Sequence, residues 1–363
     1  MIVSNGSRTV AKAAVARRPA RHMRIAVFSY RLPVVGQRRG GVDRFAHDLA
    51  DGLARRGHQV EVWSYDPAPE GAAYVVRPLP LKRFFDSWLG MRLTFGYFGN
   101  LIAAVPDYAG ADVVIAMGDS LLLPLRGKPV MRVMLGSALG EALSSTTPWR
   151  FLMQMGVYLQ ELATAVFQKG CVAISHSTLD HNPLIRNVIP IGIDLELFRP
   201  DPSMKTPEPT VLFVGTLDGR KRGQLLVDAF TSEVYPWLPT ARLIVVGPRG
   251  PEVEGVEYRT GVAAEELAAL YRSAWVYATP SSYEGFGLPY VEAMASGTPV
   301  IASSNPGSRE ILQNGRYGLL ASDDEFGASI LALLQDDEAR RLGAERGLAR
   351  AQEYGLSSVL TAY

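Results

Sequence analysis

The sequence predicts an α/β protein with two domains, each built on a parallel β-sheet covered by helices. Three observations support this fold class. Short β-rich runs alternate with amphipathic helical stretches in both halves of the chain. The length of 363 residues allows two domains that each bury a core. A polar, Pro-rich stretch at 201–209 interrupts the alternation, so we place the domain boundary near 198–209.

Composition and charge are typical of a soluble globular protein, with 47% hydrophobic and 20% charged residues. The net charge of +1 gives no reason to expect a nucleic acid or another polyanion as partner. The one cysteine, Cys171, excludes an internal disulfide and fits a reducing compartment, and its apolar neighbours indicate a small buried side chain. No apolar run is long enough to cross a bilayer, so we expect a cytoplasmic protein.

The N-terminal stretch, residues 1–22, is basic and has no acidic residue. It lacks the sustained apolar core of a secretory signal. We expect a disordered extension here, ahead of a first domain that starts at Met23. A basic tail that touches a membrane is the less favoured alternative.

The first half opens with a βαβ unit. Residues 24–30 form an expected strand, apolar residues recur at helical spacing over 42–53, and residues 59–65 return as a strand. Gly40 and Gly41 lie at the strand-to-helix turn. A glycine pair at this place is either a simple hinge or a loop that lets a ligand approach the main chain.

The rest of the first half is less regular. Residues 81–97 mix cations with aromatic side chains, and such a segment can lie on an anionic membrane surface. A helix packed on the core or lining a cleft is the favoured alternative. Further expected elements are strands at 112–117, 129–135 and 171–175 and a long apolar helix at 149–167.

The second half repeats the alternation of strands and helices. Strands are expected at 210–214, 241–247 and 275–278, a helix at 224–230, and helical structure at 338–363. The turn 215–223, GTLDGRKRG, places three cations directly after a strand. It is either a solvated basic loop or, given its position before a helix, a loop that binds the phosphates of a ligand.

The most informative stretch is 278–300, ATPSSYEGFGLPYVEAMASGTPV. A glycine-rich turn leads into a helix expected at 288–296, with Pro289 at its start. Glu284 precedes this helix and Glu292 lies about one turn inside it. The open amides and the dipole of the helix suit a phosphate, and the two carboxylates suit sugar hydroxyls. Spacing alone leaves a solvated pair of glutamates as an equal alternative.

The wording of this stretch, E-G-F-G-L-P-x-x-E-A-M-A-S-G-x-P-V-I-A, resembles the E-x7-E signature of the retaining glycosyltransferases of family 4, which have the GT-B fold. The first βαβ unit (Gly40, Gly41, Leu49, Gly57, His58, Val60) and residues 189–200, IPIGIDLELFRP, resemble that family too. The resemblance implies two Rossmann-like domains facing across a cleft, an acceptor domain at 23–198 and a nucleotide-sugar donor domain at 199–345. Residues 346–363 would form a C-terminal helix that crosses back to the first domain.

The resemblance also implies roles for particular residues. Glu284 would bind hydroxyls of the donor sugar, Lys221 would grip the diphosphate, and Glu292 would hold the ribose. Glu284 and Lys221 are thus the expected catalytic residues. The other expected donor-binding positions are Gly40, Gly41, Gly215, Phe286, Gly287 and Leu288, with 260–262 beside the base.

Two departures from the family stand out. Thr216 occupies the place of a phosphate-binding arginine, so we expect that contact to come from Arg220 or Arg222. A histidine that the family often has close to the donor sugar is missing from 135–141, LGSALGE. Its loss would mainly affect how the sugar is positioned. The chemical step itself depends on cations that stabilise the charge of the leaving diphosphate.

Two carboxylates on the expected acceptor side, Asp119 and Glu141, are candidates of low weight, because single surface carboxylates usually face solvent. No Asp-x-Asp pair and no His/Cys cluster has the spacing of metal ligands, so we expect neither a metal nor another cofactor.

The sequence therefore predicts a retaining hexosyltransferase that moves a hexose from a UDP- or GDP-type sugar donor to a hydroxyl acceptor. The acceptor could be a glycan, a lipid-linked molecule or a natural product. Two alternatives stay open: a catalytically weak sugar-nucleotide-binding protein, and a sugar-nucleotide epimerase on the same fold. Fold analogy does not separate these functions.

Overall fold

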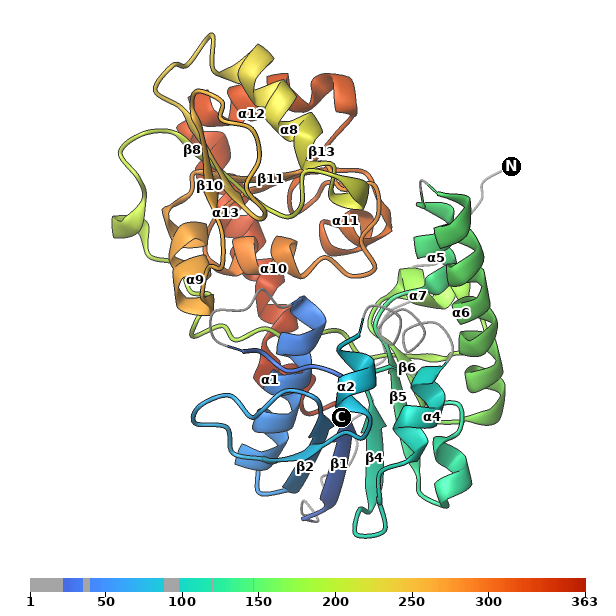
Figure 1. Ribbon diagram of the computed structural model, residues 1–363. Helices are drawn as coiled ribbons and strands as arrows, with labels where there is room; N and C mark the ends of the chain where they lie inside the picture. The colour runs from blue at the N-terminus through green and yellow to red at the C-terminus, as the bar shows by residue number, and fades with distance from the viewer. Residues whose placement is uncertain (1–21, 35–39, 88–97, 119, 146) are drawn as a thin grey trace, which may run out of the picture.

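The computed structural model describes residues 22–34, 40–87, 98–118, 120–145 and 147–363. These residues form two parallel β-sheets accompanied by helices, which confirms the predicted fold class (Figure 1). The extension expected at 1–22 lies outside the described residues, apart from His22.

The first sheet has the strand order β3-β2-β1-β4-β5-β6-β7, and every neighbouring pair is parallel. Its strands are β1 (Arg24–Phe28), β2 (Gln59–Ser64), β3 (Val75–Pro78), β4 (Val113–Ala116), β5 (Val130–Met134), β6 (Cys171–Ala173) and β7 (Asn187–Val188). The helices of this half are α1 (Gly41–Arg55), α2 (Lys82–Phe85), α4 (Gly99–Ala104), α5 (Ala138–Leu143), α6 (Pro148–Phe167) and α7 (His176–His181).

The second sheet has the order β10-β9-β8-β11-β12-β13 and is also parallel. Its strands are β8 (Thr210–Val214), β9 (Arg242–Val246), β10 (Val256–Arg259), β11 (Val276–Thr279), β12 (Val300–Ser303) and β13 (Leu319–Ala321). The helices are α8 (Gly223–Ala229), α9 (Ala264–Ser273), α10 (Leu288–Ala295), α11 (Pro306–Ile311), α12 (Phe326–Gln335), α13 (Asp337–Ala351) and α14 (Leu356–Val359). Short 3-10 turns span Leu123–Arg126, Pro202–Met204, Gly219–Lys221, Asp323–Glu325 and Gln352–Tyr354, and a π-helical turn spans Phe230–Val234.

Burial explains why these runs form strands and helices. Every residue of β11 and β12 is buried, as expected for central strands of a parallel sheet that is covered on both faces. In α1, Phe45, Leu49 and Leu53 recur at helical spacing, and this apolar stripe is buried. The local apolar pattern therefore decides which face of each element enters the core.

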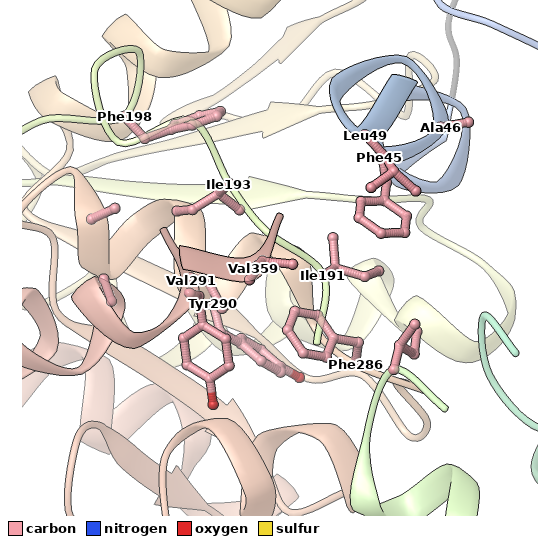
Figure 2. Close-up of a cluster of buried hydrophobic side chains, with 14 of the residues drawn as sticks. Phe45, Ala46, Leu49, Ile191, Ile193, Phe198, Phe286, Tyr290, Val291 and Val359 are labelled. Carbon is pink, nitrogen blue, oxygen red and sulfur yellow. The ribbon is translucent and has the colours of Figure 1, made fainter. Parts of the chain in front are cut away.

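One hydrophobic cluster continues from the first half into the second. It joins Phe45 of α1 to Ile191 and Ile193 of the connecting segment, and these to Phe286 and Tyr290 before and within α10 (Figure 2). All five side chains are buried. The start of α1 and the start of α10 are consequently held close together.

The C-terminal residues differ from the single helix expected at 346–363. Helix α13 ends at Ala351, and extended backbone at Gly355 forms a β-bridge with Ile193 before α14 begins. After α14, Leu360 packs so closely on Gly52 of α1 that a Cβ there would lie 2.3 Å from Leu360 Cδ1. The break arises because Gly355 pairs with the connecting segment, a contact that no local pattern reveals.

Candidate active site

The strand order of the second sheet fixes where a ligand site can form. Strands β8 and β11 are neighbours, but the chain leaves β8 toward β9 and leaves β11 toward β12, in the opposite direction. Ligands of open α/β sheets bind at such a switch point, outside the carboxyl ends of the strands. The loops that follow these strands, 215–222 and 280–287, contain the predicted cations and Glu284.

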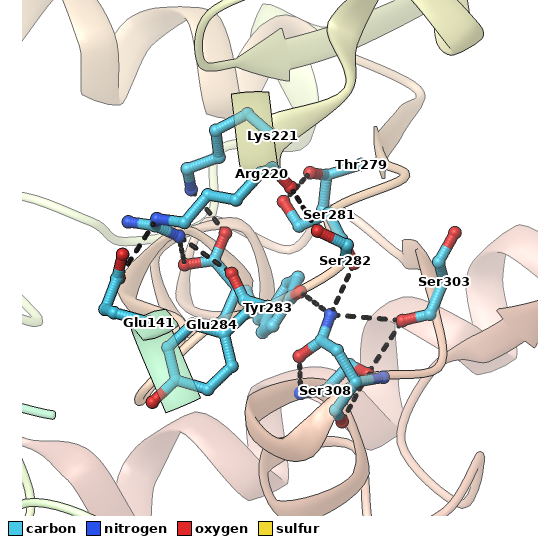
Figure 3. A network of polar contacts seen from close by, with 12 residues as sticks. Glu141, Arg220, Lys221, Thr279, Ser281, Ser282, Tyr283, Glu284, Ser303 and Ser308 are labelled. Atoms are coloured by element: carbon cyan, nitrogen blue, oxygen red, sulfur yellow. Dashed lines mark hydrogen bonds and ion pairs between the residues drawn. The ribbon is translucent and has the colours of Figure 1, made fainter. Parts of the chain in front are cut away.

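Glu284 lies between two cations at this switch point. Its carboxylate accepts hydrogen bonds from Lys221 Nζ at 2.5 Å and from Arg220 Nη1 at 2.8 Å (Figure 3). Arg220 Nη1 also donates to the carbonyl of Tyr283 at 2.8 Å. Charge-assisted bonds of this kind are the strong ones in proteins. The structure thus brings together the two predicted catalytic residues, Glu284 and Lys221, and adds Arg220.

The charge state of Glu284 follows from this contact. The carboxylate is buried, with 5% of the residue exposed, and burial alone would raise its pKa. The charges and hydrogen bonds of Lys221 and Arg220 outweigh that effect and hold the pKa of Glu284 below its ordinary value. Glu284 is therefore an ionised acceptor of hydrogen bonds rather than a general acid.

Gly215 provides the close packing that this cluster needs. A Cβ at Gly215 would lie 2.7 Å from the Phe213 ring and 3.2 Å from Lys221 Cβ. Thr216, the residue in place of the family arginine, is exposed and donates its hydroxyl proton to the Asp218 carbonyl. The Thr216 hydroxyl thus closes the turn.

Arg222 is directed elsewhere. Its guanidinium donates to the Pro280 carbonyl at 2.6 Å and to both oxygens of Asp323, at 2.6 and 2.9 Å. The residue has a left-handed backbone (φ 49°) and connects the loop after β8 to the loops that follow β11 and β13. Of the two candidates for the missing arginine, only Arg220 joins the Glu284 cluster.

Two helix N-termini converge beside the cluster. Gly287 precedes α10 with φ 101°, a conformation that favours glycine, and provides no side chain to cap the first amides. Gly41 opens α1, and a Cβ there would lie 2.6 Å from Leu288 Cδ1. The positive ends of both helix dipoles therefore face the same region, an arrangement that suits an anion. Phe286 packs edge-on against Tyr354, at 5.6 Å between ring centroids.

Glu292 is buried, one turn inside α10, and faces α1. Arg44 Nη1 lies 3.9 Å from Glu292 Oε1, and Arg44 Nε lies 3.7 Å from Asp48 Oδ2. Burial raises the pKa of Glu292 although Arg44, the hydroxyl of Tyr271 and the charge of Lys221 oppose the shift. Burial also raises the pKa of Asp48 to about 6, and the neighbouring Asp194 and Glu292 add to this.

A small pocket lies among these groups. It has a volume of about 10 Å³ and is lined by Gly41, Arg44, Phe45, Asp48, 191–194, Phe198, Leu288 and Glu292. Such a volume holds about one water molecule. At this place α1, α10 and the connecting segment therefore leave no room for a ligand larger than water.

Sequence reasoning gave too little weight to the side chains that the first half contributes to the site. Glu141 on α5 lies 3.5 Å from Arg220 Nε, and Tyr283 packs on Gly140 of the same helix. Arg44 and Asp48, which the sequence analysis did not single out, line the pocket. Their four-residue spacing on one helix was the only available signal. Asp119 lies outside the described residues.

The described ranges contain no group of three or more His, Cys, Asp or Glu residues that could hold a metal ion. Cys171 is buried, which raises the pKa of its thiol and agrees with a packing role. Within the same ranges, no helix has both the length and the apolar character needed to cross a membrane.

Two sequence families match the chain. The family described as Glycosyltransferase Family 4 matches residues 39–197, and the family described as Glycosyl transferases group 1 matches residues 208–336. The first match contains α1 and α5, and the second contains the Glu284 cluster and α10.

Individual proteins agree with these matches. The O-antigen chain mannosyltransferase B of Escherichia coli is 36% identical over 168 residues, 41% of this chain and 43% of that protein. The MMP alpha-(1->4)-mannosyltransferase of Mycolicibacterium hassiacum is 27% identical over 91% of this chain and 94% of that protein. Over several other curated relatives as well, the match spans only about half of the relative's own length.

A solved structure shows the same fold. Anabaena HepE, in complex with UDP and glucose, superposes with a TM-score of 0.72 and 19% sequence identity, over 94% of this chain and 98% of that one. Each half of the chain matches a glycosyltransferase family, and the two sheets take up the arrangement seen in HepE. The chain therefore belongs to glycosyltransferase family 4 and has the GT-B fold.

Proposed function

We propose that the protein is a retaining glycosyltransferase that moves a hexose from a nucleoside-diphosphate sugar to a hydroxyl acceptor. One observation supports this most strongly: the buried Glu284 lies between Lys221 and Arg220, beside the uncapped N-terminus of α10. A carboxylate for sugar hydroxyls and cations for a diphosphate are thereby adjacent.

The chain's own groups can perform the reaction without a side-chain base. The acceptor oxygen attacks the anomeric carbon on the face from which the diphosphate departs, so the new C–O bond replaces the old one with retention. The acceptor proton passes to the departing phosphate oxygen. Lys221, Arg220 and the amides of α10 stabilise the charge that develops on this oxygen. Glu284 accepts hydrogen bonds from the sugar and keeps it in place.

Binding of a donor ribose at Glu292 is proposed to need α1 and α10 to move apart. The pocket beside Glu292, at about 10 Å³, has no room for a nucleotide sugar, and small-molecule sites typically measure ~300–1,000 Å³. On opening, Glu292 becomes free to accept hydrogen bonds from a ribose, and Arg220 and Lys221 can turn toward the diphosphate. Closure then excludes water.

The donor is proposed to be of UDP or GDP type, without a metal or other cofactor. HepE was solved with UDP and glucose, and one curated relative is named a GDP-mannose-dependent mannosyltransferase, which supports both bases as candidates. A nucleotide that binds the folded state raises apparent stability, by about 2.7 kcal/mol at a hundredfold excess over Kd. Thermal shifts with UDP, GDP and ADP, each with and without EDTA, test this assignment.

The test of activity uses hydrolysis of UDP-glucose and GDP-mannose, which needs no known acceptor. We expect Lys221→Ala to lower the hydrolysis rate by about 100-fold, because removing one donor to a developing anion costs ~10²–10³ in kcat. Arg222→Ala should keep both nucleotide binding and most of the rate, because its guanidinium bonds Asp323 and Pro280 instead. Equal losses in the two variants would contradict the proposed site.

The alternatives predict different outcomes of the same assay. A protein that is only stabilised by nucleotides and never hydrolyses a donor would be a sugar-nucleotide-binding protein. Interconversion of one donor into another without an acceptor would identify an epimerase. Release of hexose, or its transfer to an added hydroxyl compound, supports the transferase.

We also propose a cytoplasmic location with peripheral contact to the inner membrane face through residues 81–97. Leu81 is 62% exposed, and Phe84 and the cation Arg83 are exposed beside it. Phe85 is buried, so α2 is anchored to the first half. Apolar and cationic side chains on one exposed turn suit an anionic lipid surface. Residues 88–97 lie outside the described ranges.

A further inference from the structure

The segment that lacks the family histidine approaches the Glu284 cluster closely. A Cβ at Gly285 would lie 3.2 Å from Gly136 Cα. The hydroxyl of Tyr283 donates to the carbonyl of Ser137 at 3.4 Å. This segment then becomes α5, whose N-terminus is capped by Ser137. A side chain that α5 directs toward the second half therefore lies against the loop that contains Glu284.

The side chain at that place is Glu141. Its Oε1 lies 3.5 Å from Arg220 Nε (Figure 3). Its Oε2 accepts a hydrogen bond from Arg150 at 2.9 Å. The Glu141 side chain is 26% exposed, so this ion pair is only partly open to solvent. Among the ion pairs of the described residues, it is the one that links the first half to the Glu284 cluster.

Arg220 is thereby shared by two carboxylates from opposite sides of the interface. Its Nη1 bonds Glu284, which belongs to its own half, while its Nε pairs with Glu141 of the other half. A planar guanidinium with both edges occupied has little freedom to rotate. The orientation of Arg220 therefore depends on whether the two halves are closed.

We propose that Glu141 is a positioning residue, which holds Arg220 on Glu284 when the two halves are in contact. This inference rests on the proposed function. Glu141 acts through Arg220 and need not touch the donor. It also competes with the donor, because a diphosphate needs the same guanidinium. A carboxylate in this place therefore weakens the hold on the diphosphate and at the same time orders the closed state for reaction.

The two effects predict an unusual combination in Glu141→Gln. The variant keeps the size and hydrogen-bonding capacity of the side chain but loses the charge. We expect UDP or GDP to bind about two- to fivefold more tightly, because one competing anion is gone, whereas kcat for donor hydrolysis falls by about the same factor. Partly exposed ion pairs are worth ~0.5–1 kcal/mol, which corresponds to this range.

The experiment measures nucleotide Kd by calorimetry and kcat for hydrolysis of UDP-glucose and GDP-mannose on the full chain. Glu141→Asp retains the charge on a shorter side chain and should recover part of kcat. Glu61→Gln is the matched control, because Glu61 forms an ion pair with Arg77 in the same half, on the β2–β3 edge. A role confined to stability would weaken nucleotide binding or lower the melting temperature.

Tighter nucleotide binding together with slower turnover in Glu141→Gln alone supports the proposal. Unchanged or weaker binding, or a kcat equal to that of Glu61→Gln, overturns it. Failure of the proposed function looks different, because the unaltered protein would then hydrolyse neither donor, whether or not it binds a nucleotide. If Glu141→Gln does not fold, Glu141→Asp decides: the same pattern in weaker form supports the proposal, and its absence overturns it.

Discussion

The contact between α5 and Tyr283 allows the closed state to be perturbed without touching a charged group. Gly140 lies inside α5, and a Cβ on it would be 2.5 Å from Cε2, Cζ and Oη of Tyr283. Replacing glycine by alanine within a helix normally stabilises the helix by about 0.5–1 kcal/mol. Any loss of activity in Gly140→Ala must therefore come from the interface between the two halves, and not from the helix itself.

The expected size of that loss follows from the geometry. Ordinary carbon contacts begin near ~3.5 Å, so α5 and the ring must move apart by about 1 Å. Overpacking of this kind typically costs ~1–3 kcal/mol. The chain can avoid the cost by opening, so we expect a population of the closed state lower by about 5- to 150-fold, since 1.4 kcal/mol is tenfold. The melting temperature should change little.

Donor hydrolysis and thermal melting together check this reasoning. Gly140→Ala should lose activity while its melting temperature stays close to that of the unaltered protein. Gly110→Ala is the control, because a Cβ at Gly110 meets no atom within 4 Å. Adding Tyr283→Leu to Gly140→Ala removes the clash and should restore part of the activity. Equal activity of Gly140→Ala and Gly110→Ala would refute the link between closure and reaction.

Two further predictions concern stability and membrane contact. The pKa of Asp48 is raised from 3.8 to about 6, chiefly by burial, so the folded state favours the neutral acid. The stability that this group contributes is present below pH ~4 and is lost as pH rises through ~6. Asp48→Asn should therefore raise the unfolding free energy by about 1–3 kcal/mol at pH 8 and by less at pH 5, as measured by urea denaturation. A gain that does not change with pH would contradict the assignment. In the second prediction, the protein should sediment with vesicles that contain anionic lipid, and the double variant Leu81→Glu, Phe84→Glu should stay in the supernatant. Equal sedimentation of both proteins with these anionic vesicles would contradict the contact.

Local patterns predicted much of the fold. The helix expected at 288–296 is α10, and the apolar helix expected at 149–167 is α6. The strands expected in both halves are present, with ends shifted by one or two residues. These elements depend on periodicity, on proline and on glycine, which act within a few residues.

The same kind of reasoning failed where a residue's partner is distant in the chain. Arg222 was a candidate for phosphate binding because it follows a strand, but Asp323, about one hundred positions later, occupies its guanidinium. The C-terminal helix is interrupted because Gly355 pairs with Ile193. Neither partner can be recognised from the neighbouring sequence.

The sequence by itself determined the α/β alternation, the glycine turns and the family, because the spacing of apolar residues and the residues of a motif are local properties. Only the tertiary structure decided that Glu284 lies between Lys221 and Arg220, that Glu141 reaches Arg220 from the other half, and that Arg44 and Asp48 line a small pocket beside Glu292. The physical reason is that ion pairs and close contacts depend on distance in space. Strand order sets that distance, and the chain between the partners does not reveal it.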